Sequence, residues 1–130
     1  IVGCTSEHAL EHAMSAYHEQ LPHGAGLIMI AEAYYTHFIE AHVCDDRFVR
    51  MAQALGMADA AQPIDFILAL RSLMGACGVA ELKMSDYGIT PAEFDTMAAN
   101  ARDTMGRLFF NDRAALTPED CVAIYQRSYR

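Results

Sequence analysis

Three histidines near the start of the chain have a spacing that could build a metal site. His8 and His12 are four residues apart, so on one helix their side chains would project from the same face, about one turn apart. His23 follows Pro22, where we expect the chain to turn back and begin a second helix beside the first. Neutral imidazole is a common ligand of iron and zinc. The pattern therefore indicates histidines that converge on a metal at a helix–turn–helix.

A second interpretation of these histidines stays open, in which they are unrelated residues on polar or half-buried faces. A catalytic Fe²⁺ or Zn²⁺ normally has at least three protein ligands and one open position, and two or three imidazoles alone would hold it weakly. The remaining histidines, His18, His37 and His42, each stand alone among Tyr, Phe or Ala, so we expect them to be structural. The residues alone do not decide between the two interpretations.

Several signatures of complete catalytic sites are absent from the sequence. It contains neither a GxGxxG nor a GxxxxGK phosphate loop, no HExxH, and no Asp followed by His four residues later. Gly24-Ala25-Gly26 is too short to form a nucleotide loop. The chain begins at Ile1 without an initiator methionine or a leader pattern, which predicts that it was cut, in the cell or by design, from a longer protein. We therefore expect further ligands to lie upstream.

Composition predicts a single helical domain over residues 1–130. The chain is 53% hydrophobic, and Ala, Leu, Met and Glu dominate while no segment alternates apolar and polar residues for long, so the fold class is all-α. A net charge of −8 argues against nucleic-acid and anionic-membrane partners. The longest apolar stretch, 27–35, is interrupted by Glu32 and is too short to span a membrane. Four cysteines without a CxxC pair are expected to be core residues in a reducing cytoplasm: Cys4, Cys44, Cys77 and Cys121.

Start and stop signals divide the chain into helices. We expect helices from an N-cap at Ser6 to about Gln20, from near Gly24, over roughly Asp46–Leu55, and from Pro63 to near Gly75–Gly78. Two further helices should begin at Thr90-Pro91-Ala92-Glu93 and Thr117-Pro118-Glu119-Asp120, each with a threonine cap, a proline in the first turn and an acid. The helix near Gly24 is hydrophobic on nearly every side, which predicts a place in the middle of a bundle.

Three segments of the chain resemble the iron-containing (group III) alcohol dehydrogenase family. They are the run from His8 to Tyr17, the Leu21-Pro22-His23-Gly24-Ala25-Gly26-Leu27 turn, and the C-terminal Asn111-Asp112-Arg113 with Leu116-Thr117-Pro118-Glu119-Asp120. The likeness covers essentially the whole chain. It implies the helical C-terminal domain of a longer enzyme, whose nucleotide-binding domain is absent here.

The resemblance also implies roles for the three histidines. His8 and His23 match two of the family's four ligands to Fe²⁺, or sometimes Zn²⁺, while an Asp and a His of an upstream Asp-x-x-x-His segment supply the others. His12 matches a histidine near nicotinamide and substrate, and is the catalytic candidate. Two departures are a His12–His23 interval one residue longer than is common, and Ser15 where many members have glycine. They bear on how the helix approaches the cofactor and leave the ligand assignment intact.

The implied function of the parent protein is NAD(P)-dependent interconversion of a small alcohol and an aldehyde, with the metal as a Lewis acid. The 130-residue chain alone should be inactive, and an apolar face exposed around its second helix predicts self-association into a homo-oligomer. A stand-alone helical metal-binding or assembly module without catalysis is the alternative. A self-sufficient metal hydrolase is a third hypothesis, but it lacks a general base beyond Glu7, Glu11 and Glu19.

Overall fold

The computed structural model describes residues 3–130, so the start of the chain at Ile1 lies outside the described residues. Within that range the chain forms six α-helices and three short 3₁₀ segments, without a strand. The α-helices are α1 (Ser6–Tyr17), α2 (His23–Glu40), α3 (Asp45–Ala54), α4 (Asp65–Ala76), α5 (Phe94–Met105) and α6 (Pro118–Ser128). The 3₁₀ segments are η1 (Met84–Tyr87), η2 (Pro91–Glu93) and η3 (Gly106–Asn111). The all-α prediction is confirmed.

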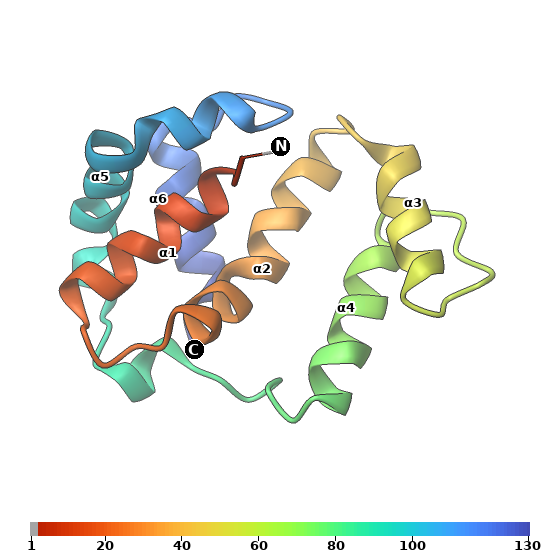
Figure 1. Ribbon diagram of the computed structural model, residues 1–130, viewed down its shortest axis with the longest axis horizontal. Helices are drawn as coiled ribbons and strands as arrows, with labels where there is room; N and C mark the ends of the chain where they lie inside the picture. Colours follow the sequence, from red (N-terminus) through yellow and green to blue (C-terminus); the bar gives the residue numbers. More distant parts are fainter. Residues whose placement is uncertain (1–2) are drawn as a thin grey trace.

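Helix α2 runs through the middle of the molecule, as its apolar sequence predicted. Figure 1 shows α1, α5 and α6 gathered on one side of α2, and α3 with α4 on the other. Helix α2 contacts α1, α4 and α6, and α1 also packs against α5. An aromatic group on α2, Tyr34, Tyr35 and Phe38, packs edge to face within itself and against Phe48 and Phe66 of α3 and α4. These aromatic side chains therefore serve in packing. Their contacts join the two sides of the molecule.

The side of the molecule that contains α1 holds the best-packed core. Leu10 and Met14 of α1 are fully buried against a layer that includes Ile30 of α2 and Met97 of α5. The hydroxyl of Tyr125 on α6 is also buried and donates a 2.7 Å hydrogen bond to the Leu10 carbonyl oxygen. Because a buried polar group must be paired, this bond restricts how α1 can sit on α6. The helix that carries His8 and His12 is therefore held firmly.

The boundaries of α1 differ from the prediction for local reasons. Thr5, not Ser6, occupies the extended N-cap position, and the Ser6 hydroxyl is buried and donates to Tyr34 Oη at 3.2 Å. The helix ends at Tyr17 rather than near Gln20, and the chain turns before Pro22. Since Pro22 takes an extended conformation, α2 begins at His23. The short turn places the start of α2 beside α1.

The two threonine–proline starts are confirmed with small differences. Thr117 Oγ1 accepts a 3.2 Å hydrogen bond from the Asp120 backbone N–H, and α6 begins at once. At the other start, the Thr90 backbone N–H donates to Glu93 at 2.7 Å, but a 3₁₀ turn intervenes before α5. Residues Met84–Tyr87, before the Thr90 start, form the 3₁₀ segment η1.

The cysteines depart from the core role expected of them. Only Cys121 is buried, while Cys44 is partly exposed and Cys4 and Cys77 are exposed. Each of the exposed pair lies near the end of an element, where apolar neighbours in sequence do not ensure burial. Among residues 3–130, no helix combines the length and the apolar character needed to cross a bilayer.

Candidate metal centre

Helices α1 and α2 bring three imidazole rings together. His8 and His12 project from α1, and His23 is the first residue of α2 after the turn. The ring centroids of His8 and His23 are 5.4 Å apart, and those of His12 and His23 are 5.1 Å apart. His23 therefore lies within reach of both histidines of the preceding helix, which is the arrangement that the spacing and the Pro22 turn implied.

The cluster lies at the surface of the domain, where outside groups can reach it. His12 is exposed, the His23 side chain is 49% exposed, and His8 is partly buried. Burial, followed by the nearby His23 and His12 rings, lowers the pKa of His8 below its ordinary value. A lowered pKa favours the neutral imidazole, which is the form that binds a metal ion.

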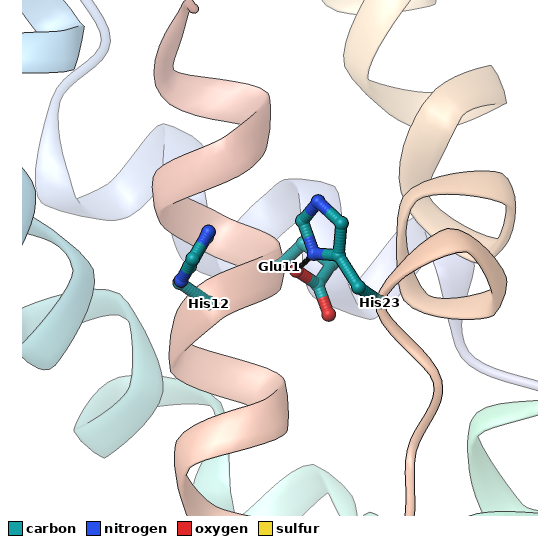
Figure 2. A group of neighbouring side chains, drawn as sticks. All are labelled: Glu11, His12 and His23. Atoms are coloured by element: carbon teal, nitrogen blue, oxygen red, sulfur yellow. Dashed lines mark hydrogen bonds and ion pairs between the residues drawn. The ribbon is translucent and has the colours of Figure 1, made fainter.

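A buried carboxylate lies directly beneath the cluster. The Glu11 side chain is fully buried, and its Oε2 is in hydrogen-bond contact with Nδ1 of His23. Its second oxygen, Oε1, accepts one from the Ser15 hydroxyl, one turn further along α1. Figure 2 shows the Glu11 carboxylate against the His23 ring between α1 and the start of α2, with His12 also on α1. Both Glu11 oxygens are thus engaged inside the protein.

A glycine on α2 makes room for this carboxylate. A Cβ atom on Gly26 would lie 2.7 Å from Glu11 Cγ and 2.8 Å from Glu11 Oε1, closer than real Cβ contacts come. Gly26 is itself buried. Helix α2 therefore approaches α1 closely at this point because residue 26 has no side chain.

The donor atoms can be compared with what a divalent metal requires. One ligand atom each of Glu11, His12 and His23 lies within 4.8 Å of the others, a group that leaves out His8. Because the Glu11 side chain is fully buried, the donors that an ion can reach from the surface are imidazole nitrogens. His8 lies as near to His23 as His12 does, to within a few tenths of an ångström between centroids. The donor set suits Fe²⁺ or Zn²⁺, although it is incomplete for either.

The other histidines have structural partners or contacts elsewhere. His18 Nε2 lies 2.8 Å from Glu93 Oε1, and His42 Nδ1 lies 3.0 Å from Asp45 Oδ2. The His37 ring packs edge to face against Phe38. His18 and His42 thus have hydrogen-bond partners of the kind expected of structural histidines, whereas His37 has an aromatic contact.

A family comparison agrees with this architecture. A model of the Fe-containing alcohol dehydrogenase family, C-terminal part, matches residues 2–129. The chain belongs to the Fe-containing alcohol dehydrogenase family. The match extends over all six helices, so the resemblance drawn from the three sequence segments is confirmed.

Solved alcohol dehydrogenases share the fold. An alcohol dehydrogenase from an archaeal halo-thermophile of a Red Sea brine pool is similar to 95% of this chain with a TM-score of 0.85 and 23% identity, over 32% of its own length. A 1,3-propanediol oxidoreductase gives a TM-score of 0.82 at 18% identity, and an alcohol dehydrogenase from Oenococcus oeni gives 0.78 at 22%; each covers 96% of this chain and 32% of the solved chain. This chain therefore spans about a third of their length. No curated protein sequence matches it.

Sequence reasoning missed the part that Glu11 plays in the Fe-containing alcohol dehydrogenase domain. It treated Glu11 only as a general base for the hydrolase hypothesis. Two signals were present: Ser15 stands four residues after Glu11, in reach on the same helix face, and Glu11 shares a helix face with the apolar Met14 three residues later. Neither signal identifies His23 as the partner, since that contact depends on how α2 packs.

Proposed function

We propose that residues 1–130 are a single helical domain, the C-terminal part of an iron-dependent alcohol dehydrogenase that uses NAD(P) to interconvert a small alcohol and its aldehyde. His8 and His23 are the two metal ligands from this domain, and an Asp and a His from the absent part of the enzyme complete the set. The observation that carries the proposal is the approach of the His8 and His23 rings, 5.4 Å between centroids, in a chain of this family.

The residues present fit such a metal. Two imidazoles, one partly and one half exposed, face the surface, the pKa of His8 is lowered toward the neutral form, and the buried Glu11 carboxylate is paired with His23. When bound, the ion supplies a Lewis acid for the alcohol or aldehyde oxygen, while the nicotinamide carries the hydride. Zn²⁺ would satisfy the same ligands.

We propose that His12 acts on the substrate, and its exposure supports this role. Its side chain is exposed, one turn along α1 from His8, and no hydrogen-bond partner within residues 3–130 engages its ring. An exposed, uncommitted imidazole beside a Lewis-acid site can orient the substrate oxygen or relay its proton through a ring nitrogen. The chain by itself should show no dehydrogenase activity, since it holds neither the nucleotide site nor the full ligand set.

The experiment is metal analysis of the full-length enzyme. His8→Ala and His23→Ala are each purified, and iron and zinc per subunit are measured by mass spectrometry beside alcohol oxidation with NAD⁺ and NADP⁺. We expect each variant to lose most of its metal and its activity, because removing one ligand leaves the site short of donors. Metal content equal to that of the wild type in both variants would overturn the proposal.

A matched control removes an imidazole outside the cluster. His42 lies in the turn after α2 with a positive φ of 54°, and pairs with Asp45 at the surface. His42→Asn suits this position because asparagine tolerates the left-handed backbone. This variant should keep its metal and its activity, which excludes a general effect of histidine loss.

A further inference from the structure

We propose that Glu11 is a positioning residue: its buried carboxylate holds the His23 ring in the Nδ1–H tautomer and leaves Nε2 as the unprotonated nitrogen for the metal. This inference rests on the proposed function, which makes His23 a ligand. The supporting contact is the hydrogen bond from His23 Nδ1 to Glu11 Oε2.

Glu11 and His23 differ in burial, and this difference shows which edge of the His23 ring faces the core. Glu11 is fully buried while His23 is 49% exposed, so the carboxylate holds the inner edge of the ring and the outer edge faces away from the core. A carboxylate acceptor fixes the ring proton on the nitrogen it contacts. The remaining nitrogen then carries a free lone pair, which is what a metal ligand needs.

Both oxygens of Glu11 have partners inside the protein, and this burial favours a supporting role over that of a ligand. Ser15 Oγ donates to Oε1 and His23 donates to Oε2. A buried carboxylate without such partners would be costly, so the pair of donors accounts for its presence in the core. Each oxygen keeps a second lone pair, but because the side chain is fully buried, an ion that bound Glu11 directly would have to enter the core.

The space that the Glu11 carboxylate occupies depends on the absence of a side chain at Gly26. A Cβ at that position would overlap the Glu11 side chain, so α2 can pass over Glu11 only with glycine there. The carboxylate is thus confined between α1 and α2 and cannot easily take another rotamer. Ligating histidines commonly donate their second N–H to a carboxylate, and loss of that partner typically lowers metal affinity by about 10–100-fold.

The first test reads the tautomer of His23 directly, without metal. Long-range ¹H–¹⁵N spectra of the histidine-labelled 130-residue chain, recorded at a pH where imidazole is neutral, report which ring nitrogen carries the proton. We expect Nδ1–H in the wild type. In Glu11→Gln, the amide oxygen should accept the hydrogen bond from the Ser15 hydroxyl, and the amide NH₂ should donate to Nδ1 of His23. The ring proton of His23 should then be on Nε2.

Glu7→Gln is the matched control. It neutralises another buried carboxylate one turn earlier on α1, which bonds to Tyr35 and has no bond to His23. His23 should keep the Nδ1–H tautomer in this variant. A merely structural role of Glu11 would leave the His23 tautomer unchanged in both variants. If Glu11→Gln does not fold, the wild-type spectrum still decides, because Nε2–H in the wild type would overturn the inference.

The second test measures metal affinity in the full-length enzyme. Co²⁺ titration, followed by its visible absorption, should give a Kd about 10–100-fold higher for Glu11→Gln than for the wild type, and an unchanged Kd for Glu7→Gln. Equal affinities for all three would overturn the inference. Failure of the proposed function can be told apart from failure of this inference. If His23 is not a ligand, His23→Ala keeps its metal, whatever the tautomer of His23 in the wild type.

Discussion

Glu7 and Glu11 lie one turn apart on the buried face of α1, yet their surroundings differ. Glu11 has two donors, Ser15 and His23. Glu7 has one, the hydroxyl of Tyr35 at 3.2 Å, and lies beside apolar side chains such as Leu27 and Ile28. Burial accordingly raises the pKa of Glu7 to about 7. The same residue type therefore has two hydrogen-bond partners in one place, and in the other has one partner and a raised pKa.

The raised pKa of Glu7 makes stability depend on pH. The unfolded chain loses this proton near pH 4.5, whereas the folded chain keeps it until about pH 7. The free energy of unfolding should therefore fall as pH rises through this window, by roughly 3 kcal/mol from this group, and level off above it. Glu7→Gln removes the titration, so its stability relative to the wild type should grow by that amount between pH 4.5 and 7.5.

Urea denaturation of the metal-free chain at several pH values measures this difference. Glu19→Gln, an exposed glutamate after α1, is the control and should track the wild type throughout. A Glu7→Gln curve parallel to the wild-type curve would show that Glu7 titrates in the folded chain as it does in the unfolded one.

At the scale of elements, the approach of α1 and α2 depends on a missing side chain. Glu11 fills the space beside Gly26, and it cannot move without breaking its bonds to Ser15 and His23. Gly26→Ala should therefore destabilise the chain by about 1–3 kcal/mol, because the added methyl group overpacks a buried contact. Thermal or urea unfolding measures the loss.

Gly75 provides the opposite case on another helix. It lies in the last turn of α4, where an added Cβ would meet nothing within 4 Å. Gly75→Ala should stabilise the chain by about 0.4–1 kcal/mol, since alanine has less freedom to lose on folding. If Gly26→Ala were as stable as Gly75→Ala, the close approach of the two helices would not be rigid.

At the scale of the whole molecule, the two sides of α2 are packed unequally. The largest fully buried side chains belong to α1, α2, α5, α6 and the segment around Met84–Ile89, and none to α3 or α4. Leu68 and Leu73 of α4 are nearly half exposed. The link between Arg71 of α4 and Glu32 of α2 is an exposed ion pair, which contributes little.

The unequal packing of α1 and α4 predicts that the two helices open locally at different free-energy costs. In native-state hydrogen exchange, amides of α4 should exchange through local opening that costs a few kcal/mol less than the opening of α1, because fewer buried apolar contacts hold α4. Amides of α1 near Leu10, beneath the Tyr125 bond, should exchange only on global unfolding. Equal protection in α1 and α4 would mean that the domain opens as one unit.

The local signals in the sequence were reliable wherever the controlling contacts are local. Helix starts at Thr90 and Thr117 depend on groups three residues away, and the apolar run of α2 requires burial on all sides. Boundaries moved where distant contacts intervened: Ser6 lost the N-cap position to Thr5 while bonding to Tyr34, 28 residues later. The prediction that the cysteines are buried was wrong for three of the four for the same reason, since neighbours in sequence do not determine neighbours in space.

For the candidate site, the order of residues was enough to predict the all-α class, the family, and two histidines on one face of α1 with a third after a proline turn. Helical periodicity and turn chemistry are properties of a few adjacent residues, so they can be read along the chain. Only the tertiary structure decided that Glu11 lies under His23. That contact requires α2 to cross α1 where Gly26 has no side chain, and such a crossing depends on packing across the whole core.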